Sequence, residues 1–179
     1  MDNFERRESG LFVPTEGKIL TEGNYHWQHV RDGKVIDEWD VKNIVTTEGL
    51  NHMLGVTLGA ATQITSWFLG LFSGNYTPVS SDAAATFVGS ATEVTSITNT
   101  SRPAWTPAAP SAAAITNAAN KATFTFNAAG NVYGSFLASA SALSATTGVL
   151  FSAARFSAAK TVAVNDQLLM TYTLSAASS

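Results

Sequence analysis

The chain has 179 residues, of which 45% are hydrophobic, and this is enough for one domain with a core of its own. It contains no cysteine, which excludes disulfides, thiol nucleophiles and thiolate metal sites. The formal net charge of -3 argues against a nucleic-acid-binding protein. No apolar run reaches the roughly 18 to 20 residues of a membrane span, and the stretch MDNFERRESGLF lacks the apolar region of a signal peptide. We therefore expect neither nucleic acid nor a membrane as a partner.

Charge is concentrated at the start of the chain. Residues 1–48 hold ten acidic and six basic side chains, whereas residues 49–179 hold three and four. The long remainder is rich in Ala, Ser, Thr, Gly and Asn. Soluble monomers usually carry interspersed surface charge, so a nearly neutral surface suits a protein that is packed in an assembly. A compositional habit of the source organism would give the same pattern.

Residues 1–22 show no clear hydrophobic period and are interpreted as an extended arm, either without fixed structure or laid on a partner. Four apolar side chains stand apart in this polar stretch, and we predict that they bind a partner: Phe4, Leu11, Phe12 and Val13.

Residues 24–45 are predicted to form a β-hairpin. The runs YHWQHV and VIDEWDVKNIV flank RDGK, and an Asp-Gly pair between strand-like runs is the strongest short hairpin signal. With a two-residue turn, the register places His26 opposite Trp39 and Trp27 opposite Glu38. Each face of the hairpin would then carry one tryptophan.

Residues 47–58 are predicted to form a short helix with Thr46 or Thr47 as its N-cap. Apolar residues recur on one helical stripe, at Leu50, Met53, Leu54 and Leu58.

Only strands are expected between residues 64 and 174, in the stretches ITSWFLGLF, FVGSATEVTSIT, KATFTFN, NVYGSFLAS, GVLFSAARF, KTVAV and QLLMTYTL. The last of these places Leu168, Met170, Tyr172 and Leu174 on one face. The predicted fold class is all-β, an antiparallel β-sandwich or jelly roll with an N-terminal hairpin and one short helix. Residues 23–179 would form this single domain.

The segment TSRPAWTPAAPSAAA, residues 100–114, has three prolines within eight residues and cannot be a central strand or a helix interior. We interpret it as a long loop, with Trp105 as the buried side chain that anchors it.

The histidines give no metal site. His26 and His29 are three residues apart on a strand and therefore point to opposite faces. Glu48 and His52 share a helical face at positions i and i+4, which we interpret as a surface ion pair. No second pair is visible to complete a metal site with them.

The carboxylates give no catalytic pair. Asp37 and Glu38 diverge along a strand, and Glu38 and Asp40, which share a face, are interpreted as solvated charge. A two-carboxylate hydrolase needs its pair facing one cleft. The chain also lacks a G-x-S-x-G elbow, a P-loop and a dinucleotide fingerprint. We expect no enzymatic activity, no catalytic residues, no metal and no cofactor.

The order of several stretches resembles a group of small virion structural proteins of tailed bacteriophages. The likeness extends over about residues 35 to 177 and rests on EWDVKNIVTTEGLNHMLGVTL, TSWFLGLFSGN, SRPAWTPAAPSAAAITNAANKATFTFNAAGNVYGSFLAS and AVNDQLLMTYTLSA. The charged N-terminal region lies outside it. The resemblance implies a coat-associated role in the virion, as a capsid cement (decoration) protein or in the tail, and it supplies no site residues.

The expected function is that of a cement protein that stabilises the major capsid shell, with the major capsid protein, other virion proteins and copies of itself as partners. A tail or fibre module that contacts host-surface glycan or protein is the alternative. A groove of exposed Trp, Tyr and carboxylates would favour that module. A carbohydrate-acting enzyme on a sandwich fold would need an acidic pair in a cleft.

Overall fold

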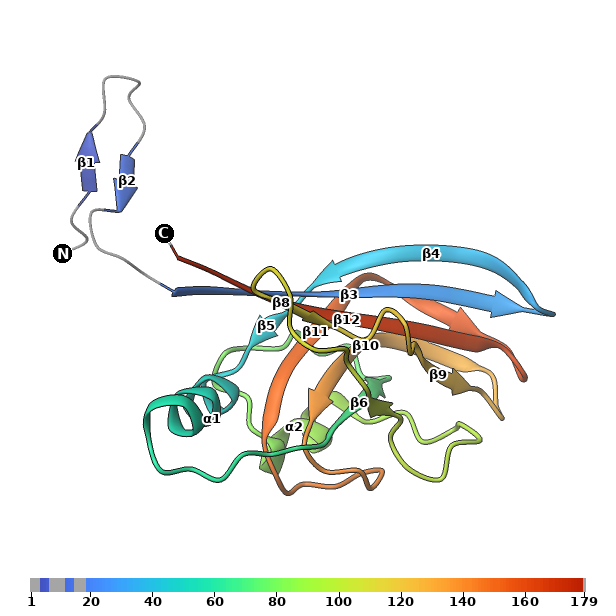
Figure 1. Cartoon of the computed structure of the whole chain (residues 1–179). Helices are drawn as coiled ribbons and strands as arrows, with labels where there is room; N and C mark the ends of the chain where they lie inside the picture. The colour runs from blue at the N-terminus through green and yellow to red at the C-terminus, as the bar shows by residue number, and fades with distance from the viewer. Residues whose placement is uncertain (1–3, 7–11, 15–18, 179) are drawn as a thin grey trace.

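The computed structural model describes residues 4–6, 12–14 and 19–178, the first two ranges by their backbone alone. This part contains twelve strands and two helices, and ten of the strands form two antiparallel sheets packed face to face (Figure 1). The all-β sandwich is therefore confirmed. A jelly roll has eight strands in two sheets, and the strand orders found here do not establish it.

Sheet I has the order β5-β11-β10-β6-β7, and all its pairs are antiparallel. Its strands are β5 (Ile44–Val45), β11 (Leu150–Val162), β10 (Gly130–Ala138), β6 (Trp67–Phe72) and β7 (Ala104–Trp105).

Sheet II has the order β4-β3-β12-β8, and β9 pairs with the other end of β12. Its strands are β4 (Lys34–Lys42), β3 (Ile19–Arg31), β12 (Gln167–Ser178), β8 (Ala114–Thr116) and β9 (Ala122–Thr125). Residues 19–22, which the sequence analysis assigns to the arm, belong to β3 and pair with β12. Two further strands, β1 (Phe4–Arg6) and β2 (Phe12–Pro14), pair with each other.

The hairpin of β3 and β4 differs from the predicted register. Asp32 and Gly33 form its tight turn with φ values of 49° and 72°, as a two-residue hairpin requires. A register shift next to His29 then places Trp27 opposite Trp39 instead of Glu38. A bulge adds one residue to one strand and moves every later side chain of that strand to the other face. The prediction of one tryptophan on each face is therefore wrong, and the two indoles stack with their centroids 6.1 Å apart.

The main core lies between the two sheets and is rich in aromatic residues. Leu168, Met170 and Tyr172 of β12 are fully buried in it, and Leu174 packs against it, which confirms the predicted face of this strand. Tyr172 stacks on Tyr25 of β3 with the ring centroids 4.4 Å apart.

A second helix, α2 (Ala84–Ala91), covers the outer face of sheet I (Figure 1). The sequence pattern predicts extended structure here, and this prediction is wrong. The helix is short and has no side-chain N-cap, so its local signal is weak. Its position is set by Phe87, whose buried ring meets Phe72 and Phe136 edge-on at 5.7 and 5.3 Å. Tertiary packing, more than local sequence, therefore determines that α2 is a helix.

Helix α1 (Thr47–Leu58) has the predicted bounds, and the Thr46 hydroxyl caps it by accepting a hydrogen bond from the amide of Gly49 at 3.0 Å. Gly49 is the only fully buried residue of the helix. A Cβ at this position would lie 2.5 Å from the backbone oxygen of Phe151, so only glycine permits this close approach to β11. Leu54 and Leu58, on the predicted apolar stripe, are 54% and 82% exposed. The helix therefore covers its end of the sandwich incompletely.

Candidate functional site

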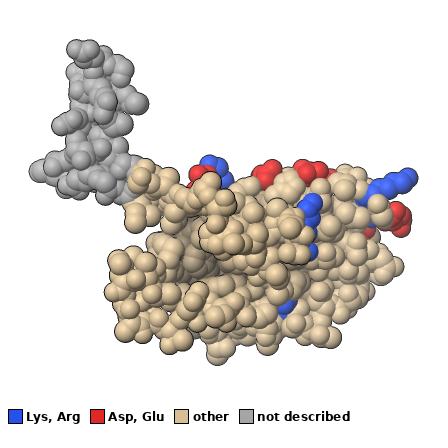
Figure 2. Space-filling view, viewed as in Figure 1, with Lys and Arg blue, Asp and Glu red and all other residues tan. Residues whose placement is uncertain are grey.

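A groove with a volume of about 210 Å³ opens between α1 and the neighbouring ends of the two sheets. The helix contributes His52, Met53 and Val56 to its wall. From sheet I come Trp67, Trp105, Leu137 and Phe151, and from sheet II Ile115, Tyr172 and Leu174. Figure 2 shows the molecule hollowed between α1 and β8.

Aromatic rings fix the shape of the groove. The imidazole of His52 meets Trp67 edge-on at 5.6 Å, and Trp67 meets Phe151 in the same way at 5.4 Å. Trp105 pairs with Trp67 across the edge of sheet I and packs on Tyr172 with the centroids 5.6 Å apart. Its indole N–H donates to the backbone oxygen of Tyr172 at 3.3 Å. Trp105 of the proline-rich loop makes these contacts, but it is half-buried instead of buried, and its anchoring role stays a prediction.

The lining of the groove contains no Asp, Glu, Lys or Arg. Its polar side chains are His52, Thr57, Gln63 and Tyr172, together with the indoles of Trp67 and Trp105. Burial raises the pKa of the Tyr172 hydroxyl to about 12, so this group stays protonated at neutral pH. A cavity of about 150 Å³ can hold a benzene ring, so this groove is sized for one or two apolar side chains.

Glu48 and His52 do not form the predicted surface ion pair. One carboxylate oxygen of Glu48 accepts hydrogen bonds from the amides of Ala84 and Leu150, at 2.9 and 2.7 Å. Glu48 thereby ties α1 to the first turn of α2 and to the start of β11. Since these partners lie 36 and 102 residues away, sequence spacing could not indicate them.

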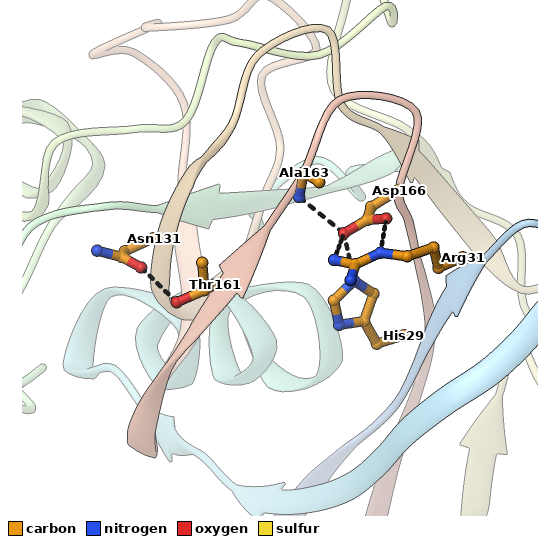
Figure 3. A network of polar contacts seen from close by, with 6 residues as sticks. All are labelled: His29, Arg31, Asn131, Thr161, Ala163 and Asp166. Atoms are coloured by element: carbon orange, nitrogen blue, oxygen red, sulfur yellow. Dashed lines mark hydrogen bonds and ion pairs between the residues drawn. The ribbon is translucent and has the colours of Figure 1, made fainter.

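Asp166 is the centre of a buried polar cluster (Figure 3). Nε and Nη2 of Arg31 donate to its two carboxylate oxygens, both at 2.7 Å, and His29 Nε2 lies 2.8 Å from Oδ2. The amide of Ala163 donates to the same oxygen at 2.7 Å. The Arg31 guanidinium and these further donors hold the pKa of the buried carboxyl well below its usual range.

The Asp166 cluster fastens the turn between β11 and β12 to the end of β3. Arg31 donates to both carboxylate oxygens of Asp166 and so holds this turn in place. The cluster could not be predicted from sequence spacing, because His29 and Asp166 are 137 residues apart. The prediction that His26 and His29 lie on opposite faces is confirmed, since His29 is buried and His26 is on the outer face with Glu38 and Asp40.

On that outer face the imidazole of His26 lies between two carboxylates. Nε2 is 2.9 Å from Glu38 and Nδ1 is 3.2 Å from Asp40. Both carboxylates are exposed, and Asp37 instead binds Lys160 of β11 at 2.7 Å. The three acids therefore form no catalytic pair in a cleft.

Among the residues that the structure describes, no three histidine or carboxylate side chains are grouped so that they could hold a metal ion. Neither of the described helices is long and apolar enough to cross a membrane. Phe4 lies in β1, and Phe12 and Val13 lie in β2, with side chains that are not described; Leu11 lies outside the described residues. Their predicted role in partner binding stays a prediction.

No protein-family model matches the chain, and no curated protein matches it. The fold and the groove define an all-β sandwich with an aromatic groove at one end whose lining contains no Asp, Glu, Lys or Arg.

Proposed function

We propose that this protein is a structural component of the virion of a tailed bacteriophage, most specifically a cement protein bound to the major capsid shell. The observation that carries the proposal is the apolar groove set in a nearly uncharged surface. The charged side chains visible in Figure 2 gather along the β3–β4 side, and the rest of that face is almost free of them. Exposed apolar surface without charge marks a place where another protein binds.

In the proposed mechanism, the protein stabilises the shell by burying surface at many contacts. The rigid sandwich bridges neighbouring coat subunits, other virion proteins or copies of itself. An interface of standard size buries about 1,600 Å², and many such contacts on one shell multiply each other's strength. No catalytic step and no cofactor enter this mechanism, and its place of action is the virion.

The second candidate is a tail or fibre module that contacts host glycan or protein, and the tryptophans of the groove favour it. Trp67, Trp105 and Tyr172 present the aromatic surface that such a module would use. The carboxylates expected beside them are missing from the groove, because Glu38 and Asp40 lie on the outer face of sheet II. Cement binding therefore remains the first proposal.

The test is the position of this chain in intact particles of the phage that encodes it, determined by cryo-electron microscopy. Density repeated over the outer capsid lattice is the expected result. Density at the tail tip would replace the first proposal by the second, and a chain absent from purified particles would overturn both.

A further inference from the structure

One wall of the groove is formed by a segment that contains no buried residue. This segment, residues 106–116, runs from Trp105 at the edge of sheet I to Asn117 and includes β8; it is called the flap here. None of its residues, all of which the structure describes, is buried. Ile115 of β8 lines the groove and pairs with Leu174 of β12, which lines it too (Figure 1). The flap therefore closes one side of the groove without taking part in the core.

Both ends of the flap are fixed to β12. The indole of Trp105 packs on Tyr172 and donates to its backbone oxygen at 3.3 Å. Asn117 is fully buried, and its side-chain oxygen accepts a hydrogen bond from the amide of Tyr172 at 2.7 Å. Its side-chain nitrogen donates to the backbone oxygen of Met170 at 3.3 Å. A movement of the flap therefore takes place between Trp105 and Asn117.

Few bonds hold the flap between these two ends. Strand β8 pairs with β12 only over residues 114–116. The hydroxyls of Thr116 and Thr173 lie 2.8 Å apart, and the amide of Ala176 donates to the backbone oxygen of Ala113 at 2.9 Å. Segments with few buried apolar contacts and exposed backbone hydrogen bonds open at a lower free energy than the core. The flap has both properties.

The turn of the flap is strained. Ala112 and Ala113 have φ values of 50° and 57°, and around them Ser111 and Ala114 exchange two backbone hydrogen bonds of 2.9 Å. A two-residue turn with positive φ at both positions favours Asn-Gly or Asp-Gly, because a side chain with a Cβ is unfavourable there. The β3–β4 hairpin has the favoured Asp-Gly pair at the same two positions. The closed flap, with two alanines, therefore carries backbone strain that is released when its turn unfolds.

We propose that the flap is a movable wall of the groove, which closes against β12 and opens between Trp105 and Asn117. Opening takes Ile115 out of the groove wall and uncovers Leu174 together with the edge of β12 that β8 covers. The closed groove has room for one or two apolar side chains, and the open groove accepts a wider apolar surface. This inference goes beyond the proposed function, because it concerns access to the groove whatever binds there.

Hydrogen exchange of the full chain, followed by mass spectrometry, measures the opening. Amides in peptides that cover residues 108–116 should exchange about tenfold faster, or more, than those in peptides that cover residues 28–37, because local opening sets the exchange rate. Residues 28–37 contain the turn of the β3–β4 hairpin, which is also exposed and has the favoured turn residues. Equal or stronger protection of the flap would overturn the proposal.

The double substitution Ala112→Asn and Ala113→Gly gives the flap the favoured turn. Exchange of the flap should then slow by about fivefold or more, because the strain of the closed form is removed. Exchange of residues 28–37 should stay the same. If the flap of this variant exchanges as fast as that of the wild type, strain in the turn does not control its opening and the proposal fails.

A disulfide lock tests the direction of the movement. Thr116 and Thr173 are paired between β8 and β12 with their hydroxyls 2.8 Å apart, so Thr116→Cys and Thr173→Cys can form a bond across this pair. The chain has no other cysteine, so the oxidised and the reduced forms of one protein differ only in this bond. Oxidation should slow exchange of the flap, and reduction should restore it. Equal exchange of the two forms would show that the flap does not leave β12.

Thiol labelling tests whether the flap controls access to the groove. Leu174→Cys places a single thiol in the groove, and its rate of reaction with a bulky maleimide is measured with the natural turn and with the Asn-Gly turn. The Asn-Gly turn should slow this reaction by about the same factor as it slows exchange of the flap, because both require the same opening. Leu54→Cys, which is 54% exposed on α1, is the control and should react equally fast with either turn. A reaction at position 174 that does not depend on the turn would overturn the role of the flap as a movable wall.

Discussion

Arg102 and Glu93 form a bidentate ion pair that is closed off from water, with Nε–Oε1 at 2.7 Å, Nη2–Oε2 at 2.8 Å and each side chain 1% exposed. The guanidinium also donates to the backbone oxygens of Ala140 and Ala145, and the amide of Ser144 donates to the carboxylate at 2.7 Å. The pair therefore joins the start of the proline-rich loop to the loop between β10 and β11.

Removing one partner of this pair should be severely destabilising. Arg102→Leu leaves the Glu93 carboxylate buried without its counter-charge, and breaking a buried pair in this way costs about 3 to 5 kcal/mol of unfolding free energy. Urea unfolding followed by tryptophan fluorescence measures it. The double variant Glu93→Leu, Arg102→Leu should lose less than the sum of the two single losses, because the two residues are coupled. Additive losses would show that the pair does not act as a unit.

Arg102 lies in the R-P-A-W stretch, where the sequence could predict a loop but not the ion pair. The prolines predicted a loop, and this segment adds to the sheets only the two residues of β7 and the first residue of β8. The partner of Arg102 could not be predicted, because the sequence held no sign that Glu93 is buried. The strand-like stretches with clear alternation, such as β12, were predicted correctly, since period-two patterning is a local property.

Elements decided by tertiary contact could not be predicted in the same way. Helix α2 depends on the burial of Phe87 against sheet I, and the hairpin register depends on one bulge. The groove escaped notice because its lining is drawn from residues between His52 and Leu174. Trp105 was singled out as an anchor, but nothing in the sequence showed that it would face Trp67.

The Asp166 cluster should make the protein sensitive to acid. The pKa of Asp166 is lowered in the folded state by Arg31, the Ala163 amide and His29. Its stabilising contribution is therefore fully present above the ordinary carboxyl pKa of about 4 and is lost as the pH falls toward the lower, folded-state value.

Asp166→Asn removes this dependence while it keeps the shape of the side chain. We expect the unfolding free energy of the variant to be about 2 to 4 kcal/mol lower at pH 7, because a buried, charge-assisted network is broken. The difference in unfolding free energy between the wild type and the variant should become smaller between pH 4 and pH 2. Urea unfolding at a series of pH values measures this difference. Asp40→Asn, on the exposed outer face, is the control. A constant gap over this range would contradict the prediction.

Trp105 should contribute to stability through its packing and its hydrogen bond. Truncating a fully packed aromatic to alanine costs about 3 to 5 kcal/mol, and a half-buried indole should lie at or below the lower limit, near 2 to 3 kcal/mol. Trp105→Phe keeps the contact with Tyr172 but loses the indole N–H donor, so it should cost only about 1 kcal/mol. Thermal unfolding of the two variants separates these effects, and an unchanged melting temperature for Trp105→Ala would refute the anchoring role.

Deleting residues 1–13 should leave the sandwich folded and weaken its association with particles. In the described part of the chain, β1 and β2 pair only with each other, so their removal breaks no pairing of sheets I and II. Circular dichroism and thermal unfolding should be close to those of the full chain, while binding to capsid shells falls. A truncated chain that unfolds would show that the segment belongs to the core.

Association through the body of the protein should depend only weakly on ionic strength. Residues 49–179 carry three acidic and four basic side chains in all, and of these Asp82, Glu93, Arg102 and Asp166 are buried. Screening acts on charges, and at 1 M salt the Debye length is about 3 Å, so an interface built from apolar and small polar contacts loses little there. The measurement is release from particles, or dissociation of the purified oligomer, across about 0.05 to 1 M salt. A fall in affinity of less than about tenfold is expected. A loss of several orders of magnitude would mean that the charged residues 1–48 carry the attachment, and the neutral body would then act as a spacer.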